Sequence, residues 1–431
     1  MMDIAKWLMD IIPSEELLGV RLRVRGSSRC ILCRGVRGLC GKPVCPILVK
    51  IYSHLKYSDS IRKKELVGSS PGIFVGRVGY PKVNIGPLVP PFIGDTLEYD
   101  TPEYWINKQI QEIVDFRSVL VRGKMLMKVK EVNHKVAEQL REIALARRAV
   151  DVEARFKDFP RKTLLLDDFE QPYGPSAKLV AFKTGNAPWD PKLEKVYYDH
   201  DLKAKDAIIY LYNHNILVSK IQKALSIGAL GLKFQRKFVP TRWSITAVDS
   251  IISQNLIEEI KQYPPIDEFR VYEYECFGNV FEILMLPRAW SYESMEAWHA
   301  GTLWNPGESI AIYGDFEDYY GRNEYASIGG CYYAARLAVT EALKRERRQA
   351  TVIIFREVHP NYVMPVGVWL VRESVRRALE KEPLRFGELA SALKRIASKL
   401  SINLERWFKV SSLLRKEIYQ RRIGDYVGRA S

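Results

Sequence analysis

Four of the chain's six cysteines fall within sixteen residues, and this cluster constrains the local fold more than any other feature. They are Cys30, Cys33, Cys40 and Cys45, spaced as Cys-x2-Cys, six residues, then Cys-x4-Cys. Disulfide frameworks are spread along small secreted chains, whereas clustered cysteines in a reducing compartment indicate a metal site. A Cys-x2-Cys turn places two sulfurs one ligand-to-ligand distance apart, and a second pair completes tetrahedral zinc coordination. The spacing predicts a compact zinc module with four cysteine ligands.

Two alternatives to zinc remain open for this cluster. An iron–sulfur cluster also takes four thiolates, and four reduced thiols without a metal are the third interpretation. Four protein thiolates leave no position for water or substrate on a zinc ion. We therefore expect the module to have a structural role and not a catalytic one.

Positive charge is concentrated around these cysteines. The chain has 66 Lys and Arg against 51 Asp and Glu, a net charge of +15, and residues 21–50 hold eight basic residues and no acidic one. Such an excess favours a polyanionic partner such as DNA, because the planar arginine side chain binds phosphate bidentately. A solvated face without a partner is the alternative. The arginines predicted to contact nucleic acid are Arg21, Arg23, Arg25, Arg29, Arg34 and Arg37.

The first part of the chain mixes strands, turns and helices. Its pattern predicts turns and short strands over residues 67–100, helices over 102–149 and 216–226, and mixed strands and turns over 160–215. The apolar run 207–212 is predicted to be a buried strand. A further helix is expected to begin near Thr246 or Asp249 and to end before Pro264 and Pro265.

The second part begins after these two prolines. Alternating, aromatic-rich residues 271–287 predict one or two strands, followed by a helix over 327–348, a strand over 350–358 and a helix over 366–381. Residues 401–419 predict one amphipathic helix. Because strands and helices mix without regular alternation, the predicted fold is α+β. At roughly 150 residues per domain, 431 residues suffice for two or three domains.

The sequence shows no sign of a membrane segment. No apolar run reaches the roughly 18 to 20 residues that span a bilayer. The N-terminal segment Met1–Leu18 carries Asp3, Lys6 and Asp10 within its apolar run, unlike a secretory signal, and predicts an amphipathic helix. We expect a cytoplasmic protein without a membrane partner.

The C-terminal residues contain a short peptide pattern. Gln420, Ile423 and Tyr426 recur at a spacing of three, so Ile423 and Tyr426 would project on one side of a 3₁₀ turn. The pattern matches the Q-x-x-h-x-x-a-a peptide that docks into sliding clamps, with Val427 where a second aromatic is expected. A fraying helix end is the alternative interpretation.

Four stretches of the chain carry a family resemblance when they are taken together. They are the cysteine cluster ending in CGKPVCP, SSPGIFVGRVGYPKVNIGPL at 69–88, FVPTRWSITAVDS at 238–250, and the C-terminal peptide. In this combination and order the chain resembles the archaeal Nre family of DNA repair proteins. The resemblance divides the chain into 1–50, the helix and zinc module; 51–262, the family's N-terminal region; 263–400, its C-terminal region; and 401–431, the helix and tail.

The resemblance implies DNA repair, a zinc finger with four cysteine ligands and binding to the archaeal sliding clamp (PCNA). Carried over by position, the zinc ligands are Cys30, Cys33, Cys40 and Cys45, and the clamp-binding residues are Gln420, Ile423, Tyr426 and Val427. Val427 departs from the preferred aromatic, which puts the strength of clamp binding in doubt. The resemblance supplies no catalytic residues.

Whether the chain is also an enzyme stays open at the level of sequence. Arg242 and Trp243 could grip a phosphate and stack a base, or could merely begin a helix. Asp315, Glu357 and His359 could bind Mg²⁺ or Mn²⁺ for phosphodiester hydrolysis, although acidic loops are commonly only solvated. The leading hypothesis is a DNA-binding repair protein recruited by a sliding clamp. The alternatives are a DNA-processing enzyme, with Arg242, Asp249, Asp315, Glu357 or His359 in its site, and an RNA-binding zinc protein.

Overall fold

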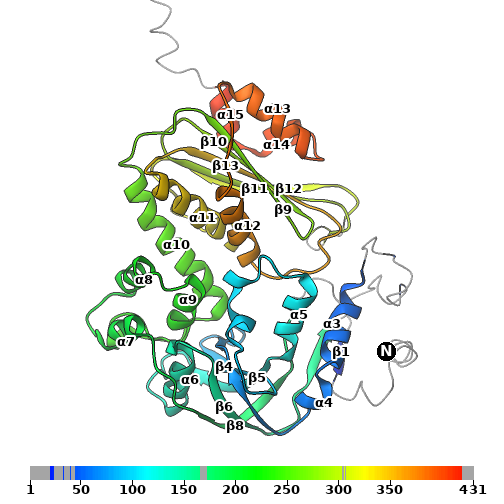
Figure 1. The fold of residues 1–431 in the computed structure, drawn as a ribbon, viewed down its shortest axis with the longest axis vertical. Helices are drawn as coiled ribbons and strands as arrows, with labels where there is room; N and C mark the ends of the chain where they lie inside the picture. The colour runs from blue at the N-terminus through cyan, green and yellow to red at the C-terminus, as the bar shows by residue number, and fades with distance from the viewer. Residues whose placement is uncertain are drawn as a thin grey trace, which may run out of the picture. The chain divides into compact units, whose positions relative to one another are not determined.

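The computed structural model describes residues 20–23, 33, 39, 44–165, 172–302, 305 and 307–419. The described residues form two compact units (Figure 1). The first takes in the chain up to Ile252 together with Val363–Trp369, and the second takes in Ser253–Tyr362 and the chain from Leu370 onward.

A six-stranded mixed sheet is the centre of the first unit, in the order β2-β6-β8-β5-β4-β3. Neighbouring strands are antiparallel except β5 and β8, which are parallel. The strands are β2 Glu65–Ser70, β3 Ile73–Val75, β4 Lys82–Val89, β5 Val121–Lys128, β6 Val150–Phe156 and β8 Ser176–Thr184. A separate parallel pair joins β1 Val20–Arg23 to β7 Lys162–Leu165.

Helices complete the first unit. They are α3 Pro46–Leu55, α4 Ser58–Ile61, α5 Ile110–Val119, α6 Lys135–Leu145, α7 Pro191–Tyr198, α8 Ala204–Asn213 and α9 Val218–Ser226, with 3₁₀ turns η2 Leu97–Asp100, η3 Pro102–Tyr104 and η4 Lys233–Gln235. The long helix α10, Thr241–Ile260, begins in the first unit and ends in the second.

The second unit is built on another six-stranded sheet, in the order β12-β11-β13-β10-β9-β14. Adjacent strands of this sheet are antiparallel except β11 and β13, which are parallel. The strands are β9 Phe269–Cys276, β10 Asn279–Leu286, β11 Ser291–Trp298, β12 Ala311–Glu317, β13 Thr351–Val358 and β14 Leu384–Phe386.

Helices cover both faces of this second sheet (Figure 1). Because side chains alternate along a strand, Ile354 of β13 packs with the end of α10 and with α11 and α12, whereas Ile353 and Phe355 pack with α13, α14 and α15. These helices are α11 Gly330–Glu346, α12 Trp369–Leu379, α13 Leu389–Lys399, α14 Leu404–Val410 and α15 Ser412–Tyr419. The unit therefore has two apolar cores, one on each side of its sheet.

The predicted α+β class is confirmed, because both units combine helices with a mixed sheet. The predicted helix 216–226 and the strand 350–358 are present as α9 and β13, and the helix 327–348 is present as α11. The N-terminal helix predicted over residues 1–18 lies outside the described residues. No described helix is both long and apolar enough to cross a membrane.

Several predictions of secondary structure were wrong, among them the strands and turns expected over 160–215, where residues 191–198 form helix α7. Residues 121–128 form strand β5 and not helix. Residues 207–212 belong to helix α8, in which Ala207, Ile208 and Leu211 are buried at helical spacing, so the apolar run is one face of a helix. Helix α10 begins at Thr241, several residues before the expected start, directly after Pro240.

The single helix predicted over residues 401–419 is in fact two helices, α14 and α15, separated at Ser411. The break has a physical cause in Glu293 of β11, a buried carboxylate. Glu293 accepts hydrogen bonds from the Ser411 hydroxyl and from the backbone N–H groups of Ser412, at 2.6 Å, and Leu413, at 3.2 Å. These donors are the free N–H groups of a helix N-terminus, so a new helix begins at this point.

Candidate functional site

Two aromatic rings meet at the surface of the first unit. Tyr80, in the loop between β3 and β4, and Trp243, in the first turn of α10, have ring centroids 5.1 Å apart at an interplanar angle of 50°. Tyr80 is 43% exposed and Trp243 46% exposed. The backbone N–H of Val75 donates to Thr241 Oγ1 at 2.9 Å, which fixes the start of α10 against β3. The pair is thus held in place while much of both rings faces solvent.

Exposed basic residues lie on three segments that adjoin this aromatic pair through the backbone. Val129 donates its N–H to the Pro81 carbonyl at 2.9 Å, and Phe238 donates to the Val129 carbonyl at 2.8 Å. Lys82 lies opposite Lys128 in the β4–β5 register. Glu131 is the exposed acidic residue of the same turn, and its carboxylate accepts the Lys128 N–H. We define the basic-aromatic surface as the exposed residues Tyr80, Lys82, Lys128, Lys130, Lys237, Arg242 and Trp243.

The candidate residues of the 238–250 stretch separate into two groups. Arg242 and Trp243 are exposed on the basic-aromatic surface. Ser244 and Asp249 are fully buried, and Asp249 accepts a hydrogen bond from Gln222 Nε2 at 3.1 Å. The solvent-facing residues of this stretch can therefore contact a ligand, whereas its carboxylate belongs to the interior of the unit.

A second group of candidate residues lies at the end of two parallel strands in the second unit. In the β11–β13 register Ala297 lies opposite Glu357 and Trp298 opposite Val358. The next residues along are His299 and His359, and the His299 N–H donates to the Val358 carbonyl at 3.1 Å. Since the carboxyl ends of parallel strands meet at one edge, the two histidines become neighbours. Glu357 is two residues before His359 and shares its face.

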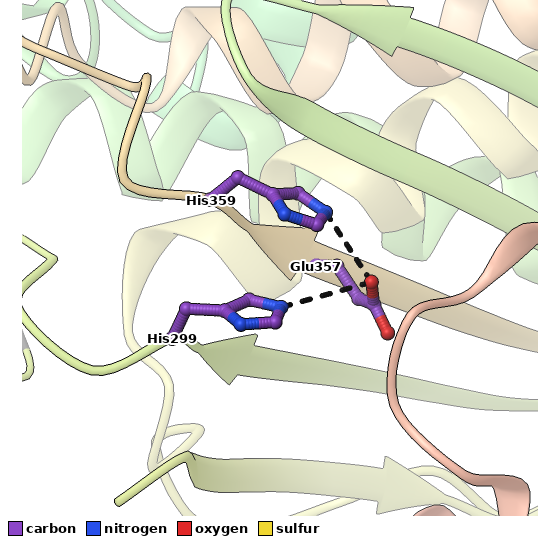
Figure 2. Close-up of side chains that lie close together, drawn as sticks. All are labelled: His299, Glu357 and His359. Carbon is purple, nitrogen blue, oxygen red and sulfur yellow. Dashed lines mark ion pairs between the residues drawn. The ribbon is translucent and has the colours of Figure 1, made fainter. Parts of the chain in front are cut away.

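The side chains of these three residues converge (Figure 2). His359 Nε2 lies 3.3 Å from Glu357 Oε2, and His299 Nε2 lies 3.9 Å from the same oxygen. The two imidazole rings stack with centroids 4.5 Å apart and an interplanar angle of 22°. One potential ligand atom from each residue lies within 4.8 Å of the other two.

Glu357 is fully buried and held by the loop between α13 and α14. Its Oε2 accepts the Ser401 N–H at 3.0 Å and the Ser401 hydroxyl at 2.8 Å, and its Oε1 accepts the Ile402 N–H at 2.9 Å. Burial by itself raises the pKa of Glu357, but His359 and these backbone donors outweigh it and hold the pKa below its ordinary value. The group is therefore a carboxylate at neutral pH.

His299 is also shifted by its surroundings. Burial and the neighbouring His359 lower the pKa of His299 below its ordinary value, against the opposing effect of Glu357. The Ser401 hydroxyl lies 3.0 Å from His299 Nε2. A neutral imidazole keeps a lone pair on one ring nitrogen, which is the form that binds a metal ion.

The sequence hypothesis joined Asp315 to Glu357 and His359, and the structure brings only the last two together with His299. Asp315 of β12 pairs with Arg322 at 2.9 Å and accepts the Ser327 N–H at 2.7 Å. These contacts occupy the Asp315 carboxylate within the fold. His299 was missed, although both strands end in an apolar residue followed by histidine, as AWH and EVH, and that repetition was the available signal.

Most of the predicted zinc and clamp residues lie outside the described residues. Cys33 is buried, and Cys45 is half-buried directly before α3, whereas Cys30 and Cys40 are not described. Gln420, Ile423, Tyr426 and Val427 all lie beyond Tyr419, the last described residue. Arg21 and Arg23 lie in β1, an extended segment. Arg25, Arg29, Arg34 and Arg37 fall outside the described residues.

Comparison with known proteins identifies the class to which this two-unit chain belongs. Residues 39–305 match the model of the N-terminal region of archaeal Nre, and residues 317–426 match that of its C-terminal region. Together these matches cover most of the chain, so the chain belongs to the archaeal Nre family. The resemblance seen in the sequence is confirmed.

Particular relatives agree with this assignment. The chain is 43% identical to DNA repair protein NreB of Archaeoglobus fulgidus, over 90% of this chain and 97% of the relative. It is 42% identical to DNA repair protein NreA of the same organism, over 85% and 92%. It is 35% identical to DNA repair protein NreA of Haloferax volcanii, over 81% and 86%. No solved structure matches the chain.

Proposed function

We propose that this chain acts in DNA repair, that it binds DNA through the basic-aromatic surface, and that a sliding clamp recruits it through residues 420–427. Its relatives are named DNA repair proteins. The observation that carries the DNA-binding step is the exposed Tyr80–Trp243 pair bordered by exposed basic side chains. The four-cysteine module, with zinc bound, adds a second basic segment.

The chemistry of the surface favours single-stranded or unpaired DNA. Aromatic rings stack on any base, at about 1–3 kcal/mol per base, but only where the face of the base is free. Lysine and arginine neutralise the adjacent phosphates and release counterions. The half-exposed rings of Tyr80 and Trp243 are open to a stacking partner of this kind. Bases unstacked at a lesion or in a displaced strand supply such a partner.

Trp243 provides the direct test. We expect Trp243→Ala to weaken binding of a fluorescent single-stranded oligonucleotide by roughly 5- to 100-fold, because the stacking contribution is removed. Fluorescence anisotropy at fixed salt measures the affinity. Tyr104→Ala is the matched control, since Tyr104 is an aromatic residue of the same unit, 50% exposed, that is not on the basic-aromatic surface. Equal affinities for wild type and Trp243→Ala would contradict the proposal.

Salt dependence tests the basic side chains separately. The double variant Lys82→Gln, Lys128→Gln removes two charges, so the slope of log affinity against log salt should decrease by about 0.7 for each phosphate that is no longer neutralised.

Binding of an RNA oligonucleotide of the same sequence tests the alternative function, RNA binding. Clearly tighter binding of RNA than of DNA would replace DNA with RNA as the ligand.

A further inference from the structure

We propose that His299, Glu357 and His359 form a binding site for a divalent transition-metal ion of the zinc class. Its residues are distinct from the four cysteines and belong to the second unit, whereas the residues of the basic-aromatic surface belong to the first. The inference therefore does not depend on DNA binding.

The spacing of the ligand atoms fits a single ion. Zinc lies about 2.0–2.2 Å from histidine nitrogen and carboxylate oxygen, so ligands in a tetrahedral shell are about 3.3–3.6 Å from one another. The two histidine nitrogens lie 3.3 and 3.9 Å from Glu357 Oε2. The two imidazole rings stack 4.5 Å apart, and all three ligand atoms lie within 4.8 Å of one another, so the two nitrogens must approach each other by up to about 1 Å to share one ion. Partly exposed histidine side chains can make such a shift.

Without a metal, the Ser401 hydroxyl links two members of the cluster, since it lies 3.0 Å from His299 Nε2 and donates to Glu357 Oε2. The direct approach of both histidines to Glu357 is less well explained without a metal. A charge-assisted hydrogen bond from nitrogen to carboxylate is about 2.7–2.9 Å long, and neither histidine reaches that distance. A cation between the two nitrogens and the carboxylate accounts for the direction in which all three point (Figure 2).

The surroundings of Glu357 are those of an oriented ligand. Metal-bound carboxylates are commonly held by hydrogen bonds from a second layer of groups. The backbone N–H groups of Ser401 and Ile402 hold the two oxygens of Glu357, and the strand pairing fixes both histidines. The loop and the strands would therefore assemble the site before an ion arrives.

The ligand set also determines which ion fits. Two imidazole nitrogens with one carboxylate suit zinc, manganese or iron(II), whereas Mg²⁺ and Ca²⁺ prefer oxygen ligands. The Mg²⁺ alternative from the sequence is thus disfavoured. The side chains of His299 and His359 are 19% and 28% exposed, while Glu357 is closed to solvent. An ion held by three protein ligands on this side keeps a position for water, as catalytic zinc sites do.

Metal counting on the full-length protein tests the proposal. Each protein is stripped with a chelator, dialysed against Zn²⁺ and analysed by mass spectrometry for zinc per chain. We expect His299→Ala and His359→Ala each to bind about one ion fewer than wild type. His200→Ala, which changes an exposed histidine outside the cluster, should bind as much as wild type. Circular dichroism confirms that the variants are folded, and because both changed histidines are partly exposed, folding should survive.

Cobalt substitution separates this site from the cysteine module. Cobalt bound to thiolates gives intense charge-transfer absorption, and cobalt bound to nitrogen and oxygen does not. Cys33→Ser should abolish the charge-transfer band and leave the weaker visible bands, which His299→Ala should then remove. If folded His299→Ala and His359→Ala retain the zinc content of wild type, the proposal is wrong.

Discussion

At the scale of single residues, the second unit contains a carboxyl group that the fold keeps uncharged. Glu282 of β10 is 1% exposed and faces the same side of the sheet as Leu284 and Leu286. Burial raises the pKa of Glu282 to about 8, with a further contribution from Glu273 and Glu357, although Lys399 and Arg395 act in the opposite direction. Within the described part of the chain its Oε2 has no hydrogen-bond partner. At neutral pH Glu282 is therefore mostly protonated.

Glu282→Gln should stabilise the protein at high pH and not at low pH. Between pH 4.5 and 8 the folded state holds a proton that the unfolded state has released, so the free energy of unfolding of wild type falls as the pH rises through this range. Glutamine has no such charge. The stability difference between variant and wild type should grow from near zero at pH 5 to on the order of 3 kcal/mol at pH 9.

Urea denaturation followed by circular dichroism at pH 5, 7 and 9 measures this difference. Glu382→Gln is the control, because its side chain is 95% exposed and its effect should not vary with pH. A constant difference for Glu282→Gln across the three pH values would show that the buried carboxyl group titrates normally.

Single residues also show how much of the candidate sites the sequence could reveal. The chemistry of Arg242 and Trp243 predicted that they contact nucleic acid, and both side chains are exposed. Glu357 and His359 were singled out as well, as potential metal ligands close together in sequence. His299 is 58 residues before Glu357 and becomes its neighbour only through the parallel pairing of β11 with β13. Periodicity in one chain segment carries no information on which strands pair.

At the scale of elements, the same limit applies to helices and strands. Helix α11 and strand β13 were predicted correctly from local signals, the start signal at Ser327 and the run of β-branched residues. The break between α14 and α15 depends on Glu293, more than a hundred residues away in sequence. Likewise the apolar run 207–212 is compatible with a strand or with one face of a helix, and only its packing in the folded protein determines which of the two it forms. The local sequence pattern therefore predicts whether most segments are helix or strand, whereas the remaining segments are determined by tertiary contacts.

The strand β4 has a position at which only glycine fits. A Cβ atom at Gly86 would lie 1.6 Å from the carbonyl oxygen of Gly123 in β5, a backbone atom that cannot move alone. The β4–β5 pairing is interrupted at this point, between Ile85–Met125 and Leu88–Arg122. Gly86→Ala should therefore separate the two strands and lower the free energy of unfolding by about 3 kcal/mol or more.

Thermal and urea unfolding of Gly86→Ala check this expectation. Gly185→Ala is the matched control in the same unit, since its Cβ would meet its nearest neighbour, the Asp151 carbonyl oxygen, at an ordinary 3.5 Å. We expect the control to differ from wild type by less than about 0.5 kcal/mol. A small effect of both substitutions would mean that β4 and β5 are farther apart than the structure indicates.

At the scale of the whole molecule, positive charge is distributed unevenly along the chain. Residues 21–50 carry eight basic residues and no acidic one, and residues 401–431 carry seven basic residues against three acidic ones. Residues 51–400 carry a net charge of +6 spread over 350 residues, and the fold gathers Lys82, Lys128, Lys130, Lys237 and Arg242 on one surface. The distribution of charge along the sequence identified the two basic ends. The basic-aromatic surface could be recognised only from the fold, because its residues come from three separate segments.

The charge at the C-terminal end bears on the proposed recruitment by a sliding clamp. Deleting residues 420–431 should abolish binding of the purified clamp in isothermal calorimetry and leave DNA binding through the basic-aromatic surface unchanged. Ile423→Ala and Tyr426→Ala should each weaken clamp binding by about tenfold or more, because a few buried anchor residues carry most of the binding free energy of an interface.

Two controls separate the apolar anchors from charge and from general exposure. Tyr419→Ala changes an aromatic residue that is 79% exposed and lies just before the peptide, so it should bind the clamp normally. Arg421→Gln with Arg422→Gln should weaken binding at low salt and match wild type at high salt, since long-range attraction is screened. The anchor variants should remain weak at every salt concentration, because burial of an apolar side chain does not depend on screening. If the truncated chain binds the clamp as tightly as wild type, recruitment occurs through another surface.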